Sequence, residues 1–215
     1  MNRALRIGVL ELQGDFYEHE AMLQRCGVQP VGVRRLAHLL DDRGEVLVDA
    51  LVIPGGESTT IGMLLDELGM LEPVRQLVRP PHALPVLGTC AGCILLAREV
   101  KSEPQLKRIG CMDIEVQRNA YGSQVDSFEC HVRSEQFADG EPLRAVHIRA
   151  PAITRLLQPE SVRVLAAIEG RPVIVQQGNL LACTFHPELT TDTRVHQHFV
   201  AMVRARTRKA MPKST

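Results

Sequence analysis

The chain has 215 residues, of which 45% are apolar and 23% charged, which is typical of a folded globular protein with room for a sizeable core. Its 25 basic residues balance its 25 acidic residues, so no overall positive charge favours nucleic acid or an anionic membrane surface as a partner. The chain has no Trp and few other aromatic residues, which disfavours base stacking, and no apolar run approaches the ~18 residues that cross a bilayer.

No segment resembles a secretory signal, so we expect a cytoplasmic protein. The six cysteines are spread along the chain, which in a cytoplasmic protein of this length favours free thiols over a disulfide framework. The cysteines and histidines lack the spacing of metal ligands. We therefore expect no metal site and no cofactor.

In the first half of the chain, short apolar segments alternate with helical patterns. Strands are expected near residues 6–12, 31–33, 49–53 and 85–87. Helices are expected after Asp15 as a capping residue, from Thr59 or Thr60 to Leu71, and from Cys90 to about Val100. This alternation predicts parallel βαβ units, whose chemistry collects at the carboxyl ends of the strands.

In the second half, candidate strands follow one another without long helices, near residues 114–116, 127–132, 145–148 and 162–167. Residues 173–185 predict a hairpin that turns at Gly178 and Asn179. A last helix is expected over about 193–206, with its inward face formed by Val195, Phe199, Met202 and Val203.

The predicted fold class is α/β. We expect a single-domain three-layer sandwich, in which a mostly parallel central sheet has helices on both faces and gains antiparallel strands in the second half of the chain. The domain is expected to span residues 1–205. Residues 206–215 are basic and are expected to form a flexible tail.

The first motif is Gly-Thr-Cys-Ala-Gly at residues 88–92, directly after an apolar strand and before a helix. This is the pattern of a nucleophile elbow, with Cys90 as the nucleophile. The glycines permit a tight turn that lifts Cys90 above the sheet, and the N-terminus of the helix favours the thiolate. The backbone N–H of Ala91 would face an oxyanion. Taken alone, the motif is equally compatible with a buried structural cysteine.

The second motif is Phe-His-Pro-Glu at residues 185–188. In an extended backbone His186 and Glu188 project to the same side, and Pro187 favours that geometry. A carboxylate beside an imidazole fixes its tautomer and stabilises the imidazolium. A lone pair of this kind is more often structural. With Cys90, however, it completes the nucleophile, base and orienting acid of acyl transfer.

The third motif is Pro-Gly-Gly-Glu-Ser-Thr-Thr at residues 54–60. It looks like a phosphate-binding loop but lacks the Lys of that motif, so nucleotide binding is not expected. Its glycines indicate either a plain turn or backbone N–H groups that bind an oxyanion or a carboxylate.

A competing motif is formed by Cys90 and Cys93, which make a C-x-x-C pair at the start of a helix, as in thioredoxin-like redox proteins. The redox interpretation explains neither of the motifs at 54–60 and 185–188. We therefore expect Cys93 to pack on the inner face of its helix.

In this order, the three motifs resemble those of the class I, triad-type glutamine amidotransferases. Further segments narrow the resemblance to the glutaminase subunits of pyridoxal 5′-phosphate synthase. These segments are Leu-Gln-Gly at 12–14, Arg-Asn at 118–119, Gln-Val-Asp-Ser-Phe-Glu at 124–129 and Ile-Arg-Ala-Pro at 148–151. The resemblance covers roughly residues 5–205.

This resemblance implies that Cys90 attacks the γ-amide of L-glutamine to form a γ-glutamyl thioester, while His186 transfers protons and Glu188 orients His186. It implies an oxyanion hole from the N–H groups of Gly56 and Ala91. It also implies that glutamine is held at six positions, namely Gly56, Glu57, Ser58, Arg118, Ile148 and Arg149.

The partner implied is a (β/α)8-barrel synthase subunit that consumes the ammonia to make pyridoxal 5′-phosphate, with Gln13 at the docking face. Two alternatives stay open. The chain could serve a different ammonia-using synthase, or it could be a catalytically silent, thiol-sensing scaffold.

Overall fold

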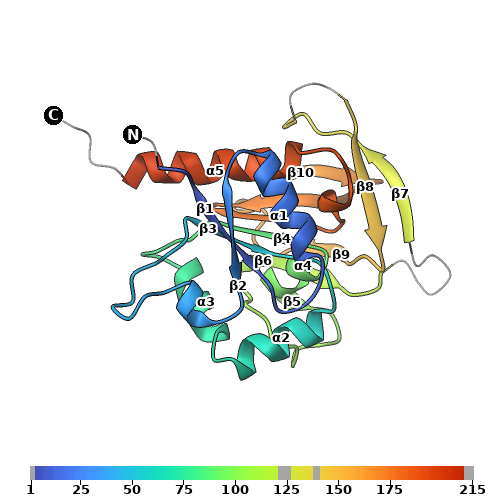
Figure 1. Cartoon of the computed structure of the whole chain (residues 1–215). Helices are drawn as coiled ribbons and strands as arrows, with labels where there is room; N and C mark the ends of the chain where they lie inside the picture. The colour runs from blue at the N-terminus through green and yellow to red at the C-terminus, as the bar shows by residue number, and fades with distance from the viewer. Residues whose placement is uncertain (1–2, 121–126, 138–140, 211–215) are drawn as a thin grey trace.

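The computed structural model describes residues 3–120, 127–137 and 141–210. Its centre is a seven-stranded sheet with the order β10-β11-β12-β4-β3-β1-β2 (Figure 1). The strands from β12 to β2 pair in parallel, and β10, β11 and β12 pair antiparallel. In chain order they are β1 (Arg6–Leu10), β2 (Gln29–Val33), β3 (Ala50–Ile53), β4 (Val86–Thr89), β10 (Arg163–Ile168), β11 (Arg171–Gln177) and β12 (Leu180–Cys183).

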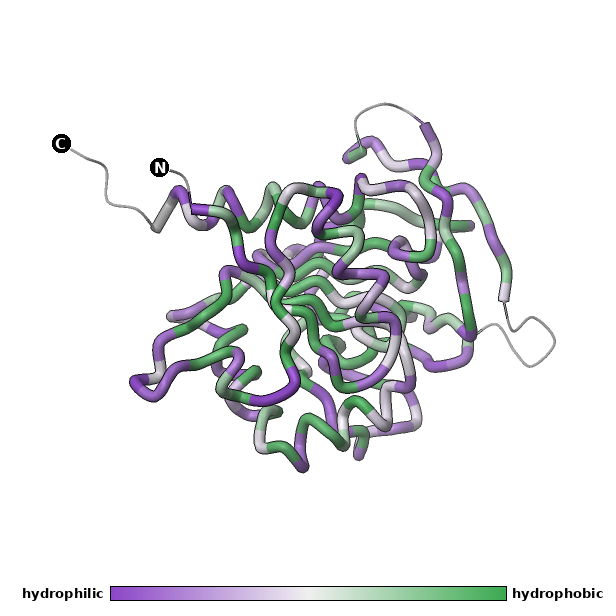
Figure 2. The backbone as a smooth tube through the Cα atoms, in the orientation of Figure 1, coloured by the Kyte–Doolittle hydropathy of each residue, from purple (hydrophilic) through white to green (hydrophobic). Residues whose placement is uncertain are grey.

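Helices cover both faces of this sheet. α1 (Phe16–Arg25) and α5 (Arg194–Ala210) pack on one face, and α2 (Ser58–Glu67), α3 (Leu71–Val78) and α4 (Ala91–Leu96) pack on the other. The central strands alternate accordingly: Val52 joins the core under α1 and α5, and its neighbours Leu51 and Ile53 join the core under the other helices. Figure 2 shows the resulting concentration of hydrophobic residues along the central strands. The predicted three-layer α/β fold is confirmed.

Two smaller sheets flank the central one. β5 (Ala97–Val100), β6 (Met112–Gln117) and β9 (Ala152–Leu156) form the first, and β7 (Ser127–Val132) pairs antiparallel with β8 (Leu143–Ile148) in the second. Short 3-10 helices, η1 (Leu36–His38) and η2 (Pro187–Leu189), complete the structure. The hairpin predicted at Gly178 and Asn179 is confirmed by β11 and β12.

Two predicted helix ends were wrong, and two further elements were not expected. The helix predicted to run to Leu71 ends at Glu67. The helix after Cys90 ends at Leu96 rather than near Val100, because residues 97–100 pair with β6 as a strand. α3 was not expected; Gly69, at φ 64°, ends the preceding helical segment, and Pro73 lies in the first turn of α3, where its missing N–H costs little. β9 was also missed, because its partner β6 lies far away in the sequence.

The C-terminal helix is longer than expected. α5 continues to Ala210, so residues 206–210 of the expected tail are helical, and residues 211–215 lie outside the described residues. The motif at 124–129 also lies partly outside them. Among the described residues, no helix is long and apolar enough to cross a membrane.

Candidate active site

Cys90 lies at the carboxyl end of the central strand β4, in the sharp turn that leads into α4. Its backbone has φ 46° and ψ −101°, a conformation that a non-glycine residue adopts only under strain. A Cβ at Gly88 would lie 2.6 Å from the carbonyl oxygen of Gly92, and a Cβ at Gly92 would lie 2.1 Å from that of Ile53. Both glycines are therefore required by close backbone packing, as a nucleophile elbow demands.

The side chain of His186 lies between the elbow and two carboxylates. Its Nδ1 is 2.7 Å from Oε1 of Glu188, and its backbone N–H donates to the carbonyl of Val146 at 2.8 Å. The strand β12 ends at Cys183, His186 is the N-cap residue of η2, and residues 187–189 form η2. The prediction that the two side chains meet was correct, but the expected reason was wrong, because a helical turn rather than strand alternation returns Glu188 to His186.

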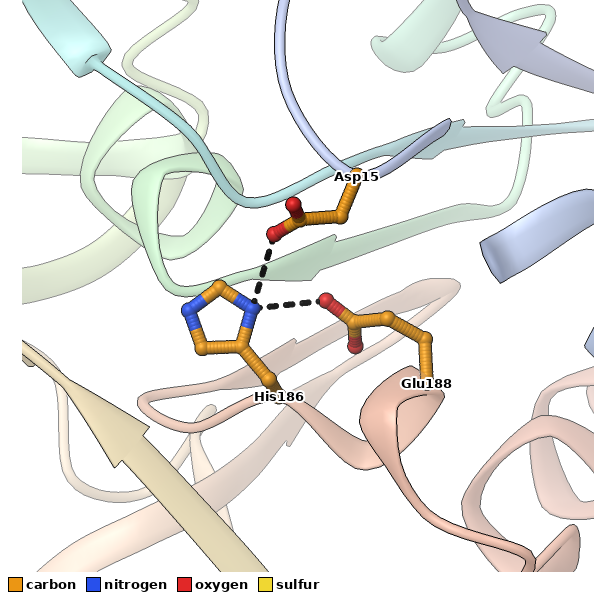
Figure 3. A group of neighbouring side chains, drawn as sticks. All are labelled: Asp15, His186 and Glu188. Atoms are coloured by element: carbon orange, nitrogen blue, oxygen red, sulfur yellow. Dashed lines mark hydrogen bonds and ion pairs between the residues drawn. The ribbon is translucent and has the colours of Figure 1, made fainter. Parts of the chain in front are cut away.

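Asp15 supplies the second carboxylate. It occupies the N-cap position of α1, as expected, but its side chain makes no capping hydrogen bond. Instead its Oδ2 lies 3.1 Å from Nδ1 of His186 (Figure 3). The contact between Asp15 and His186 was not predicted, because the sequence places Asp15 in a different motif from His186.

The imidazolium of His186 and the nearby carboxylates stabilise one another's charge. Burial disfavours the imidazolium, but hydrogen bonds to Asp15, Cys90 and Glu188 outweigh it and raise the pKa of His186 to about 12. Burial likewise disfavours the carboxylate of Glu188, yet the neighbouring His19 and His186 hold the pKa of Glu188 well below its usual range. His186 is therefore an imidazolium and Glu188 a carboxylate near neutral pH.

A buried polar network that the sequence analysis missed extends behind Glu188. Nε2 of His19 lies 3.5 Å from Oε1 of Glu188 and 3.0 Å from Oγ1 of Thr89, and Nδ1 of His19 lies 3.0 Å from Nε2 of His196. The available signal was helical spacing, since His19 falls on the same buried face of α1 as Leu23.

The Gly-Gly turn after β3 packs against the segment that follows β1. The backbone of Gly14 lies so close to Gly55 that a Cβ at Gly14 would meet its carbonyl oxygen at 1.7 Å. Gln13 Oε1 accepts the backbone N–H of Glu57 at 2.7 Å, and Gly56 has φ 149°. The two predicted oxyanion-hole residues thus lie at the carboxyl edge of the adjacent strands β3 and β4, Gly56 in the turn after β3 and Ala91 as the first residue of α4.

Two of the predicted glutamine-binding side chains already pair with each other. Glu57 caps α2 by accepting the N–H groups of Thr59 and Thr60, at 3.2 and 2.6 Å, and its Oε1 lies 2.9 Å from a terminal nitrogen of Arg118. Although burial opposes it, these hydrogen bonds and the charge of Arg118 lower the pKa of Glu57. Arg118 also contacts Glu103.

The remaining predicted positions are Ser58, Ile148 and Arg149. Ser58 is buried, and its hydroxyl has no hydrogen-bond partner among the described residues. The carbonyl of Ile148 lies 3.8 Å from Sγ of Cys90, while its side chain is 40% exposed. Arg149 follows at φ 43°, a second non-glycine residue with positive φ beside the elbow.

Asp15, His186 and Glu188 place ligand atoms within 4.8 Å of one another, which is the spacing of a possible metal site. Both carboxylates, however, contact the same ring nitrogen at hydrogen-bond distances. The arrangement is thereby explained as an imidazolium held by two acceptors.

The thiols do not favour redox chemistry. All six cysteines are free. Cys93 is fully buried in the core, as expected, and burial raises the pKa of its thiol far above the usual range. A buried thiol of this kind is a poor second member of a redox pair with Cys90.

Solved structures define the class of protein to which this fold and site belong. A crystal structure of a glutamine amidotransferase matches with a TM-score of 0.83 and 44% identity, covering 92% of this chain and 98% of that one. A chain in the structure of PurLQS from Thermotoga maritima matches with a TM-score of 0.62 at 16% identity, covering 93% and 99%, and shares the fold alone. The fold is that of a glutamine amidotransferase.

The family model described as the SNO glutamine amidotransferase family matches residues 9–205, and the chain belongs to this family. A Carboxydothermus hydrogenoformans protein named pyridoxal 5'-phosphate synthase subunit PdxT is 47% identical over 199 residues, or 93% of this chain and 98% of the relative. A protein of the same name from Frankia casuarinae is 51% identical over 201 residues, covering 93% and 96%. The resemblance found in the sequence is confirmed.

Proposed function

We propose that the chain hydrolyses L-glutamine to glutamate and ammonia, as the glutaminase subunit of a pyridoxal 5′-phosphate synthase. The observation that carries this proposal is the position of His186, whose Nδ1 lies 2.7 Å from Glu188 and whose pKa is raised by Asp15, Cys90 and Glu188. A strained thiol at a helix N-terminus, an imidazolium and a buried carboxylate are the parts that amide hydrolysis through a thioester requires.

In the first half of the reaction, the thiolate of Cys90 attacks the γ-carbonyl carbon of glutamine. The backbone N–H groups of Gly56 and Ala91 stabilise the oxyanion that forms. Both carboxylates contact Nδ1 of His186, so Nε2 is the nitrogen left to protonate the leaving amine. The carbon–nitrogen bond then breaks, ammonia departs and a γ-glutamyl thioester remains on Cys90.

In the second half, neutral His186 takes a proton from water, whose oxygen attacks the thioester carbonyl. Collapse of this second tetrahedral species breaks the carbon–sulfur bond and releases glutamate. Cys90 is again a thiolate and His186 an imidazolium. Glu188 keeps the ring in one orientation throughout, because its buried carboxylate accepts the Nδ1 proton.

We assign glutamine binding to Gly56, Glu57, Ser58, Arg118, Ile148 and Arg149. An arginine pairs with the α-carboxylate of an amino acid, and a carboxylate accepts from its α-ammonium group. Arg118 and Glu57 offer these two charges side by side, 2.9 Å apart. The buried hydroxyl of Ser58, which has no partner among the described residues, offers a further hydrogen bond.

The names of the two relatives support the proposal of a synthase partner. Their shared name makes each of them a subunit of pyridoxal 5'-phosphate synthase. We propose that a (β/α)8-barrel synthase subunit receives the ammonia and docks over Gln13, whose side chain holds the Gly-Gly turn through Glu57. The cytoplasmic location stays a prediction.

Ammonia release from glutamine tests the function. It is measured for the chain alone, with the synthase subunit, and for the Cys90→Ala and Cys93→Ala variants. We expect release to rise when the synthase subunit is added, to vanish in Cys90→Ala and to persist in Cys93→Ala. If ammonia release is the same with and without the synthase subunit, the chain serves a different synthase. If the wild type releases no ammonia under either condition, the proposed glutaminase activity is refuted.

A further inference from the structure

We propose that Asp15 is a positioning residue for this reaction. It acts through His186, by sharing the Nδ1 proton with Glu188 and holding the ring as an imidazolium. The inference rests on the glutaminase function proposed above. It adds a second, solvent-facing carboxylate to the Cys90, His186 and Glu188 group.

The geometry gives Asp15 direct access to the imidazole. Its Oδ2 lies 3.1 Å from Nδ1 of His186, and Oε1 of Glu188 lies 2.7 Å from the same atom. Figure 3 shows the two carboxylates converging on this nitrogen from different elements, the start of α1 and η2. One N–H donor thus lies between two acceptors, and the opposite ring nitrogen is left for Cys90.

The backbone fixes Asp15 against the rest of the site. Its N–H donates to the carbonyl of Gly55 at 3.2 Å. A Cβ at Gly55 would lie 2.3 Å from Cε1 of His186 and 3.1 Å from Oδ2 of Asp15. Asp15, the Gly-Gly turn and the imidazole are therefore in close contact, with no room for a side chain at Gly55. A shift of Asp15 would move both the ring and the turn that carries Gly56.

Asp15 and Glu188 differ in their surroundings. The side chain of Glu188 is 0% exposed and that of Asp15 is 35% exposed. Glu188 also contacts His19, whereas the side chain of Asp15 is partly exposed to solvent. We therefore expect the fold to tolerate loss of the Asp15 carboxylate. The expected effect of that loss is a less stable imidazolium at His186.

Besides Asp15, four other titratable groups among the described residues surround His186. Cys90 faces the ring from the elbow, Glu188 from η2 and His147 from β8, and His19 on α1 lies behind Glu188. Burial disfavours the imidazolium, which must survive until ammonia leaves. Two carboxylates on Nδ1 keep that proton on the ring to higher pH than Glu188 alone would.

The test compares Asp15→Asn, which keeps the shape and removes the charge, with Asp15→Glu, which retains a carboxylate. Glu18→Gln is the control, because Glu18 is an exposed acid on the first turn of α1. The first readout is kcat/KM for glutamine hydrolysis from pH 6 to 11, in the presence of saturating synthase partner. The second is the rate of Cys90 alkylation by iodoacetamide over the same range, followed on the Cys90 peptide by mass spectrometry.

The wild-type change at the alkaline side lies at the upper end of this range or above it, and we expect Asp15→Asn to bring the fall in kcat/KM and the change in alkylation rate into the range, about one unit lower, the size of shift that one nearby carboxylate produces. Asp15→Glu should restore at least part of this shift, and Glu18→Gln should match the wild type. Profiles of Asp15→Asn that superimpose on those of the wild type, or that fall by the same factor at every pH, overturn the proposal. If the wild type releases no ammonia, the glutaminase fails, and the alkylation profiles alone decide the role of Asp15.

Discussion

Nδ1 of His186 and Oε1 of Glu188 lie 2.7 Å apart in the interior of the protein, where the side chain of Glu188 has no exposure. The contact joins the N-cap residue of a single turn of 3-10 helix to a residue inside that turn. A short local turn therefore fixes the orientation of the proton-transferring group.

Replacing Glu188 with Gln should lower kcat for glutamine hydrolysis by about 10²–10⁴-fold, because an amide neither stabilises the imidazolium nor fixes the tautomer of His186. KM should change little, since Glu188 is not one of the proposed substrate contacts. Steady-state kinetics in the presence of saturating synthase partner check this. A fall in kcat of less than about threefold would show that Glu188 has a structural role and no role in catalysis.

The two elbow glycines should be intolerant of a methyl group. In Gly92→Ala the new Cβ must displace the carbonyl of Ile53, so we expect the free energy of unfolding to fall by about 2–3 kcal/mol. Gly170→Ala is the matched control, because Gly170 has positive φ but open space around its Cβ position. Its cost should be about 1 kcal/mol of backbone strain. Urea unfolding measures the free energy of unfolding of both variants. Equal losses of stability in the two variants would contradict the packing argument.

Acid should weaken the fold before carboxylates titrate. Burial lowers the pKa of His196 to about 3 and that of His147 to about 4, so both are neutral in the folded chain at pH 5 and protonated in the unfolded chain. The unfolded state then binds more protons, and stability is full above about pH 6.5 and is lost as the pH falls.

The expected loss between pH 7 and pH 5 is about 1–2 kcal/mol for each histidine, measured by urea unfolding. His196→Asn should reduce this pH dependence, whereas His82→Gln, at an exposed position, should not. The same pH dependence in both variants would exclude His196 as a source.

Arg118→Gln should raise KM for glutamine about tenfold or more while leaving kcat within a few-fold, because the proposed contact is to the α-carboxylate and not to the reacting amide. Arg155→Gln is a suitable control, since Arg155 also pairs with two glutamates, Glu99 and Glu115, but on the small sheet of β5, β6 and β9. A fall in kcat with unchanged KM in Arg118→Gln would remove it from the substrate site.

The sequence predicted the fold class, the elbow and the His186–Glu188 pair, because each follows from local patterns: strand, turn and helix for Cys90, and a short spacing for the pair. It did not predict the contacts of Asp15 or His19. These residues are distant in the sequence from His186 and Glu188, and the meeting depends on how α1 packs beside η2. The strand β5 was missed for the same reason, since pairing with β6 overrides the helical pattern that continues from Cys90.

The most direct test of the account is to trap the covalent intermediate. The chain and its synthase partner are mixed with saturating glutamine, quenched with acid during turnover and digested, and the fragments carrying Cys90 and Cys93 are sequenced by mass spectrometry. We expect one γ-glutamyl group on Cys90, present also in Cys93→Ala and absent from Cys90→Ala. Ammonia release that continues in Cys90→Ala, or a γ-glutamyl group on any residue other than Cys90, would contradict the mechanism.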